Sequence, residues 1–138
     1  MKFKGLNGRE YSVQTNKYIV RPDNNRGRSQ YHLRARDLLK DMFRSYTILE
    51  EMKLPGVTKI GGSLYLDFYI PNLDLAFEVH GRQHYEFVPF FHKTKAGFMQ
   101  AQRRDVLKGE WCEVNNIQLI ELSYERTDDE WREQIAGR

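Results

Sequence analysis

Two alternating segments in the middle of the chain constrain its fold more than any other feature. Leu64–Ile70 and Leu73–His80 each alternate apolar side chains with polar or small ones, which is the period of a β-strand with one buried face. The connection between the two segments is short. They therefore predict an antiparallel hairpin within a sheet.

The register of this hairpin determines which polar side chains meet. A two-residue turn at Asn72-Leu73 places Asp67 directly opposite Glu78. In the same register Tyr65 lies opposite His80, and all four side chains share one face. Directly opposed residues have Cβ atoms about 4.5 to 5.5 Å apart, so the two carboxylates repel unless a proton or a cation lies between them. The pair predicts a site for a hard cation such as Mg²⁺.

Other polar residues converge on these carboxylates. A bound cation could polarise a phosphodiester and activate water, and His80, one pleat beyond Glu78, is placed to position or deprotonate that water. Gly81 lets the backbone bend, so that Gln83 and His84 turn back toward the site. The alternative is that the carboxylates merely occupy the exposed face of a hairpin. Their apolar neighbours along both strands favour a shared site.

The remaining segments carry helix and strand signals. Ser29 is a helix N-cap that precedes apolar residues at helical spacing. Thr94–Asn115 is rich in helix formers, and Ile117–Leu122 predicts a buried strand that joins the same sheet because a helix leads into it. Thr127 and Glu130 have the spacing of a capping box and predict a short last helix.

This order of elements predicts an α/β fold with a small mixed β-sheet flanked by α-helices. A chain of 138 residues is long enough for one domain. We expect an N-terminal hairpin in residues 1–28 with its turn at Asn7-Gly8, a core in residues 29–124 and a C-terminal helix in residues 125–138. The lone Cys112 can form no internal disulfide and is expected to be a small core residue.

Charge is distributed unevenly along the chain. Residues 21–44 carry seven basic side chains against three acidic ones, and residues 79–108 carry six against two. Residues 110–133 carry eight acidic side chains against two basic ones. A nucleic-acid face would therefore use the first two segments, and the alternative is an ordinary solvated surface. No stretch is apolar over the length of a bilayer, and no signal-peptide segment begins the chain, so a cytoplasmic location is expected.

An aromatic segment at residues 85–95 ends in Lys93 and Lys95. Its rings could stack on bases or wedge into a duplex while the lysines contact phosphates, and packing against the sheet is the alternative. Arginines of the following helix could also contact phosphates. The expected nucleic-acid-binding residues are Arg82, Lys93, Lys95, Arg103 and Arg104.

These motifs resemble the PD-(D/E)XK nuclease superfamily, which pairs an Asp on one strand with Glu-x-Lys on the next. Leu66-Asp67-Phe68, Glu78-Val79-His80-Gly81 and the following Gln83-His84 are similar to very-short-patch-repair endonucleases and phage homing endonucleases. The resemblance covers residues 29–124. The chain departs from the pattern in having no lysine two residues after the Glu and no clear acidic counterpart in the first helix.

The resemblance implies a restriction-endonuclease-like core and a divalent-metal-dependent DNA endonuclease, with nicking, mismatch repair or homing as the activities of the group. Asp67 and Glu78 would hold Mg²⁺ or Mn²⁺, His80 would stand in place of the lysine, and Gln83 or His84 would support them. The implied substrate is double-stranded DNA, in a bacterial or phage-infected cell.

Three alternatives accompany these expectations. The same core could be catalytically silent and only bind nucleic acid or a partner protein. His80, His84 and His92 could form a zinc site, since imidazoles suit zinc. Asp105 and Lys108, three residues apart on the predicted long helix, could simply pair with each other.

Overall fold

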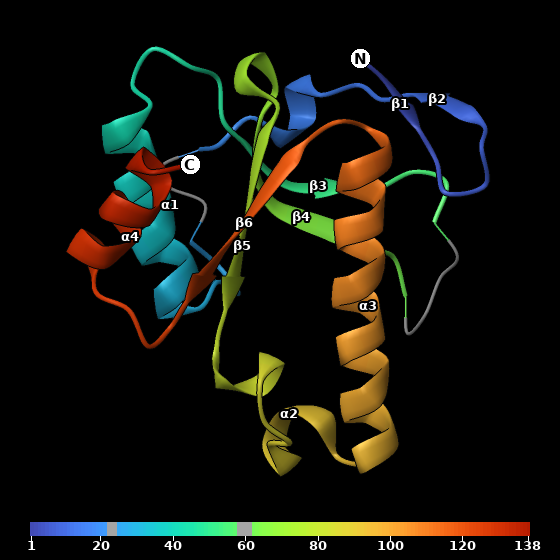
Figure 1. Cartoon of the computed structure of the whole chain (residues 1–138), viewed down its shortest axis with the longest axis vertical. Helices are drawn as coiled ribbons and strands as arrows, with labels where there is room; N and C mark the ends of the chain where they lie inside the picture. The colour runs from blue at the N-terminus through green and yellow to red at the C-terminus, as the bar shows by residue number, and fades with distance from the viewer. Residues whose placement is uncertain (22–24, 58–61) are drawn as a thin grey trace.

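A four-stranded mixed sheet runs through the middle of the molecule in this computed structural model, which describes residues 1–21, 25–57 and 62–138 (Figure 1). The strand order is β3-β4-β5-β6. The first three strands are antiparallel neighbours, and β6 runs parallel to β5. The strands are β3 (Leu49–Lys53), β4 (Tyr65–Ile70), β5 (Leu75–His80) and β6 (Gln118–Ser123). The predicted mixed α/β architecture is confirmed.

Helices cover both faces of this sheet. Figure 1 shows α1 (Gln30–Met42) and α4 (Asp128–Ala136) on one side and the long α3 (Lys95–Val114) on the other. A hairpin of β1 (Lys2–Lys4) and β2 (Glu10–Ser12) lies near the C-terminal end of α3. Short helical segments are η1 (Asn16–Tyr18), η2 (Pro71–Leu73), η3 (Arg82–His84) and α2 (Pro89–His92). In the described part of the chain, no helix has the length and apolar character that crossing a membrane requires.

Alternation along the strands divides the core into two layers. Phe68 and Phe77 pack toward α1 and α4, where Trp131 is fully buried. Their strand neighbours Tyr69 and Ala76 belong to the opposite layer, which α3 closes with Trp111, Cys112 and other apolar residues. Both faces of β5 are therefore covered. Polar residues on this strand lie inside the molecule rather than on an exposed hairpin face.

The helix caps predicted at Ser29 and at Thr127 with Glu130 are confirmed, and the structure adds a cap at Thr94 that was not predicted. The Ser29 side chain accepts a hydrogen bond from the backbone N–H of His32 at 3.1 Å. The Thr94 side chain caps α3 in the same way, and Thr127 and Glu130 form both hydrogen bonds of a capping box. These caps fix where α1, α3 and α4 begin.

The central hairpin has the predicted register but a different turn. Phe68 pairs with Phe77 and Ile70 with Leu75, which is the register expected from the sequence. The two-residue turn at Asn72-Leu73 is wrong, because η2 and Asp74 together form a four-residue connection. Asp74 has a φ of 48°, in the left-handed region, and its N–H donates to the Pro71 carbonyl at 3.2 Å. The proline favours this helical turn over a tight hairpin loop.

The strand β3 and the short helix α2 were not predicted from the sequence. The β3 segment reads Leu-Glu-Glu-Met-Lys and lacks a clean apolar alternation. Glu50 is nevertheless buried there, because Arg36 of α1 pairs with it across the sheet face at 2.9 Å. A charged residue that is buried through an ion pair breaks the alternation of apolar and polar residues by which a strand is recognised in a sequence. Residues 22–24, within the basic segment 21–44, lie outside the described residues.

Candidate functional site

Asp67 on β4 and Glu78 on β5 are linked through crossed hydrogen bonds. The backbone N–H of Asp67 donates to Glu78 Oε2 at 2.7 Å. The backbone N–H of Val79 donates to Asp67 Oδ2 at 2.8 Å. Regular pairing of the two strands ends at Phe68 and Phe77, so carboxylate oxygens replace backbone carbonyls as acceptors at this point. The structure thus brings together the two acids that the sequence register placed opposite each other.

A lysine from the long helix reaches the same carboxylates. Lys108 Nζ on α3 lies 2.6 Å from Glu78 Oε1, and both side chains are largely buried. Burial alone would lower the pKa of Lys108, but the charges of Glu78 and Asp67 and the hydrogen bond to Glu78 outweigh it, so this pKa is raised. Lys108 therefore carries its charge. The suggested pairing between Asp105 and Lys108 is wrong, since each binds a different strand or turn.

The contact of Lys108 with Glu78 was missed by sequence reasoning, which considered Lys108 only as a phosphate contact on a helix like the one that the resembled families place beside the metal site. The resemblance places a lysine two residues after the Glu, where this chain has His80. In the fold, the ammonium group comes instead from a helix thirty residues farther along the chain. Helical spacing alone could not identify it, because the partner of Lys108 lies on another element.

The surroundings of Asp67 disfavour the ionised form of its carboxyl group. Its burial and the nearby negative charge of Glu78 raise the pKa of Asp67 well above its ordinary value, while Lys108 opposes this effect. The side chain is still 26% exposed, so it is accessible from a pocket. The unfavourable negative charge of such a carboxylate is either removed by a proton or compensated by a bound cation.

His84 and Asp105 form a second polar pair beside the carboxylates. Their ring Nδ1 and Oδ2 atoms lie 2.9 Å apart. Burial alone would raise the pKa of Asp105, but the hydrogen bond with His84 and nearby positive charges lower it, so Asp105 is ionised. An ionised acceptor makes Nδ1 of His84 the donor in this bond. In the neutral form of the ring, this tautomer leaves a lone pair on the other ring nitrogen of His84.

His80 is buried beside His84. It is 5% exposed, and its ring stacks on that of His84 with 4.1 Å between centroids. Burial and the charge of His84 lower the pKa of His80, which favours the neutral ring. His84 lines the pocket described below, whereas His80 is not among its lining residues.

A pocket of about 240 Å³ joins these groups. It is half enclosed and predominantly polar. Its wall contains the Asp67 carboxylate, the Lys108 ammonium, and the side chains of Gln83 and His84, as the sequence predicted for the last two. The lining residues are Gly27, Arg28, Ser29, His32, Glu51, Asp67, Val79, Gln83, His84 and Lys108.

The first helix contributes a histidine to this pocket rather than an acid. His32 Nε2 lies 2.7 Å from Glu50 Oε2 on β3, and its Nδ1 lies 3.9 Å from Asp67 Oδ1. Arg36 and Arg28 neutralise Glu50 from the other side. The first helix therefore brings an imidazole to this pocket, and the carboxylate that pairs with it comes from β3.

Two groups of side chains could hold a cation. One is the carboxylate pair of Asp67 and Glu78. The other is His80, His84 and Asp105, with ligand atoms within 4.8 Å of one another. The predicted zinc set of His80, His84 and His92 is wrong, because the His92 ring accepts a hydrogen bond from the Val88 N–H and packs on other aromatic rings. The stacked rings of His80 and His84 lie nearly parallel, so one ring must turn before both can bind one ion.

The predicted nucleic-acid-binding residues have different surroundings. Arg82 pairs with Glu86 at 2.6 Å on the surface, and Arg104 donates to the Ser63 carbonyl at 3.1 Å. The side chains of Lys93, Lys95 and Arg103 are exposed.

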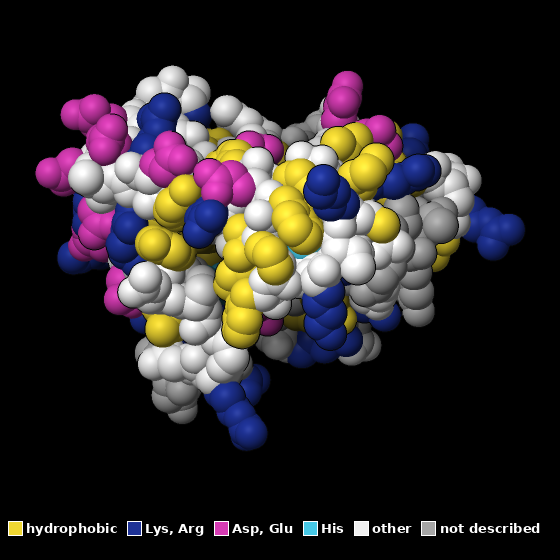
Figure 2. Space-filling model, turned by 90° about the horizontal axis from the view of Figure 1, so that it is seen from below, with side chains coloured by type: hydrophobic (Ala, Val, Ile, Leu, Met, Phe, Trp, Pro, Cys, Tyr) yellow, Lys and Arg dark blue, Asp and Glu magenta, His cyan; other side chains and the backbone are white. Residues whose placement is uncertain are grey.

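Aromatic side chains at the α2 end of the molecule are also exposed. Phe90 is 85% exposed and Phe91 is 58% exposed, whereas Phe87 packs against His92 and Phe98. Figure 2 looks onto this end and shows apolar side chains gathered in its middle with lysines and arginines among and beside them. Acidic side chains lie mostly toward the side occupied by α1 and α4. In this segment Phe87 is therefore packed against its neighbours, whereas Phe90 and Phe91 project into solvent.

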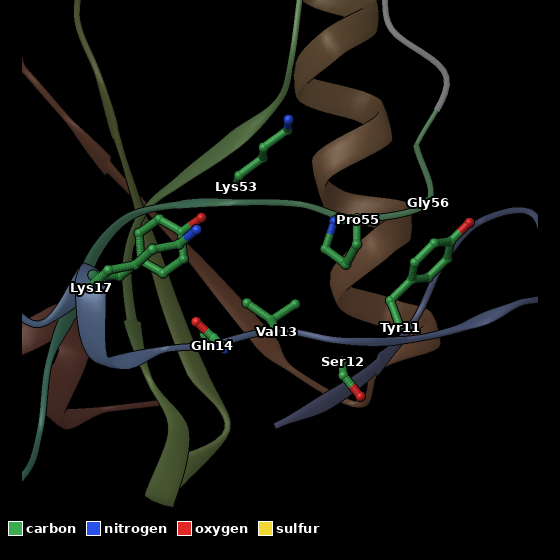
Figure 3. Close-up of a pocket in the computed structure, with 9 residues that line it drawn as sticks. Tyr11, Ser12, Val13, Gln14, Lys17, Lys53, Pro55 and Gly56 are labelled. Carbon is green, nitrogen blue, oxygen red and sulfur yellow. The ribbon is translucent and has the colours of Figure 1, made fainter.

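A larger pocket of about 530 Å³ lies at the N-terminal hairpin, away from the carboxylates. Figure 3 shows Tyr11 and Lys17 at opposite ends of it, with Pro55 along its wall. It contains no acidic side chain, cysteine or histidine. The polar chemistry of the described residues is concentrated in the smaller pocket.

The chain is similar to parts of several viral proteins. It is 48% identical over 62 residues to the uncharacterized protein 307L of Invertebrate iridescent virus 6, covering 45% of this chain and 32% of that protein. It is 42% identical over 64 residues to protein 033L of Invertebrate iridescent virus 3, also uncharacterized, covering 46% and 33%. It is 42% identical over 84 residues to the uncharacterized protein 094L of Frog virus 3, covering 59% and 54%.

These alignments span about a third to a half of the length of the relatives. No protein-family profile matches the chain, and no solved structure matches it.

Proposed function

We propose that this chain is a divalent-metal-dependent DNA endonuclease that hydrolyses phosphodiester bonds on a restriction-endonuclease-like core. The observation that carries this proposal is the meeting of Asp67, Glu78 and Lys108, with Asp67 and Lys108 lining one polar pocket and Glu78 buried between them. The sequence resemblance to PD-(D/E)XK nucleases calls for two acids and a lysine. The fold supplies this set, with the lysine donated by α3.

The donor set fits a hard divalent cation. Asp67 uses Oδ2 for the Val79 N–H, and its Oδ1 faces Nδ1 of His32 at 3.9 Å. The raised pKa of Asp67 indicates a carboxylate whose ionised form lacks full compensation in the protein alone. Asp67 and Glu78 would hold Mg²⁺ or Mn²⁺. When bound, the ion would supply Lewis-acid stabilisation of the phosphoryl oxygens.

Side chains of the protein would accept the proton of the attacking water and stabilise part of the negative charge on the phosphate. With its Nδ1–H donated to Asp105, His84 presents its other ring nitrogen as a base for a water molecule. Lys108 places a positive charge at the pocket wall, where it would stabilise the negative charge that develops on the phosphate. Gln83 lies in the same wall and would orient the water or the phosphate.

The proposed substrate is double-stranded DNA. Lys93, Lys95 and Arg103 are exposed cations on and next to α3, and they would contact phosphates. The projecting Phe90 and Phe91 would reach the grooves or bases. The relatives come from viruses named for invertebrates and a frog. The proposed setting is therefore an infected animal cell rather than the bacterial or phage-infected cell expected at first.

The test is a cleavage assay with wild type, Asp67→Asn and a matched control, Asp37→Asn, which changes an exposed acid on α1. Each protein is incubated with supercoiled plasmid, branched and mismatched duplexes, and RNA, in Mg²⁺, Mn²⁺ or EDTA. We expect metal-dependent nicking or linearisation by wild type and Asp37→Asn and none by Asp67→Asn. Asp67→Asn keeps an oxygen acceptor for the Val79 N–H, so its failure to cut would report on the metal rather than on folding.

A second candidate is a catalytically silent nucleic-acid-binding module. It is favoured by the crossed hydrogen bonds, because through them Asp67 and Glu78 connect β4 to β5 without any metal. In that case wild type and Asp67→Asn would bind DNA with equal, salt-sensitive affinity, and neither would cut any substrate.

A further inference from the structure

His32 occupies a defined place at the start of α1. The Ser29 cap accepts a hydrogen bond from its backbone N–H, which fixes the first turn of the helix. The ring is 6% exposed and lies on Phe68 with 4.6 Å between centroids. The imidazole is therefore held in one orientation between the sheet and the pocket.

The two ring nitrogens of His32 face different carboxylates. Nε2 lies 2.7 Å from Glu50 Oε2. Burial alone would raise the pKa of Glu50, but hydrogen bonds from His32 and Arg36 and the charges of Arg28 and Arg36 lower it, so Glu50 is an ionised acceptor. Nε2 of His32 therefore carries a proton. In the neutral ring, this tautomer leaves a lone pair on Nδ1.

Nδ1 of His32 faces Oδ1 of Asp67, the oxygen that does not accept from the Val79 N–H. The distance from Nδ1 to Asp67 Oδ1 is 3.9 Å, too long for a direct hydrogen bond. Glu50 occupies Nε2 of His32 and the Val79 N–H occupies Oδ2 of Asp67, so Nδ1 and Oδ1 are the atoms that face each other. Both residues line the same pocket. A cation about 2 Å from each atom would fit between them after a small adjustment.

We propose that His32 Nδ1 is a ligand of the same divalent cation as Asp67 Oδ1, and that this nitrogen makes the site prefer Mn²⁺ over Mg²⁺. The identity of the ion rests on the proposed function above, which places a divalent cation at Asp67. The physical basis is that Glu50, by accepting the hydrogen bond from Nε2, fixes the tautomer and the orientation of the His32 ring. Carboxylates commonly do this for histidines that bind a metal through the other ring nitrogen. Imidazole nitrogen binds Mn²⁺ better than Mg²⁺, whose preferred ligands are oxygens.

The test measures metal binding without DNA. Electron spin-echo spectroscopy detects ¹⁴N bound directly to Mn²⁺, and competition titrations give the affinities for Mn²⁺ and Mg²⁺. In His32→Asn the side-chain amide replaces the ring Nδ1 with an oxygen or nitrogen at a similar distance from the backbone. We expect the ¹⁴N signal of wild type to disappear in His32→Asn and the preference for Mn²⁺ to fall about tenfold.

Two further variants separate this ligand from other nitrogens. His92→Gln is the matched control, because His92 packs among aromatic rings away from Asp67. His84→Ala removes the only other histidine that lines the pocket. Both should keep the ¹⁴N signal. Loss of the signal in His84→Ala and its survival in His32→Asn would overturn the proposal in favour of the cluster formed by His80, His84 and Asp105.

The outcomes also distinguish this proposal from the nuclease assignment. Mn²⁺ bound without a nitrogen ligand would overturn the role of His32 even if DNA is cut. A nitrogen-ligated Mn²⁺ that His32→Asn abolishes would support it even if no nucleic acid is cut, and would then count against the nuclease. Failure of wild type to bind Mn²⁺ at all would overturn both. Thermal melts of each variant identify any that does not fold.

Discussion

Asp67 and Glu78 each accept a hydrogen bond from the backbone of the strand that carries the other. The Asp67 N–H donates to Glu78 Oε2, and the N–H that follows Glu78 donates to Asp67 Oδ2. The exchange uses one oxygen of each carboxylate and orients the remaining ones. Lys108 contacts the second oxygen of Glu78, and His32 faces the second oxygen of Asp67. The carboxylates are therefore positioned before any ligand binds, which lowers the cost of organising a site.

The first prediction concerns Asp67→Asn in the absence of metal. Removing this charge relieves its burial and its repulsion by Glu78, while the amide oxygen still accepts from the Val79 N–H. We expect the variant to melt roughly 3 °C or more above wild type near neutral pH, since about 1 kcal/mol shifts the midpoint by a few degrees. Added Mg²⁺ or Mn²⁺ should stabilise wild type and not the variant. Equal stabilisation of both would contradict Asp67 as a ligand.

The pH dependence of this difference has a definite sign. Because the folded-state pKa of Asp67 is raised above its ordinary value of 3.8, proton-linked stability is fully present below that value. It is lost as the pH rises through the folded-state pKa. The unfolding free energy of metal-free wild type should therefore fall relative to Asp67→Asn as pH increases. Urea unfolding of both proteins across this range measures the difference, and a constant difference would show that Asp67 is not perturbed.

The second prediction concerns Lys108→Met. The substitution leaves the Glu78 carboxylate buried without its positive partner. We expect a loss of about 3 kcal/mol or more in unfolding free energy, together with loss of cleavage. Guanidinium unfolding curves measure the former. The double variant Glu78→Gln/Lys108→Met should recover part of the stability, because the buried residue at position 78 no longer carries a charge and no longer repels Asp67.

A matched control for Lys108 is available on the surface. Lys2 pairs with Glu10 at 3.4 Å, but both side chains are more than half exposed. Lys2→Met should leave stability and cleavage nearly unchanged. If Lys108→Met were no more destabilising than Lys2→Met, the contact with Glu78 would have no energetic role in the fold.

Local sequence patterns predicted much of the fold. The caps at Ser29 and Thr127 and the register that joins Asp67 to Glu78 depend on residues within one or two elements, and the structure confirms them. These signals act over a few residues of chain. Local physical chemistry is sufficient to determine them.

The remaining parts of the site depend on contacts between distant elements. Lys108 meets Glu78 only because α3 packs across β5, and His32 meets Glu50 only because α1 covers β3. The spacing of residues along the sequence does not indicate either of these two contacts. The strand β3 was hidden for the same reason, since the ion pair that buries Glu50 comes from another element. Periodicity treats such a charged segment as exposed.

The third prediction concerns the pair of His84 and Asp105. If His84 is the base, His84→Ala should lower the cleavage rate about 10²- to 10⁴-fold with little change in substrate affinity. Added imidazole should restore part of the rate, because the missing ring leaves room at the pocket wall. Asp105→Asn should lower the rate less. Single-turnover cleavage measures each effect, and His92→Ala should not respond to imidazole.

Failure of imidazole to restore any activity in folded His84→Ala would argue that the ring positions its neighbours rather than moving a proton. Such a result would leave the metal ligands unaffected. The structural role of His84 is then its stacking on His80 and its hydrogen bond to Asp105.

The fourth prediction concerns the exposed tip of α2. Phe90 and Phe91 contact each other edge to face and are mostly exposed, so replacing them should not cost core stability. We expect Phe90→Ala/Phe91→Ala to keep the wild-type melting temperature and to weaken DNA binding about tenfold or more, as loss of base stacking does. The salt dependence of binding should stay the same, because no charge is removed. Lys93→Ala/Lys95→Ala should do the opposite and reduce the salt slope. Fluorescence anisotropy with a labelled duplex at several salt concentrations separates the two effects. If the double phenylalanine variant binds and cuts like wild type, the tip of α2 has no part in DNA recognition, and its exposed rings would need another partner.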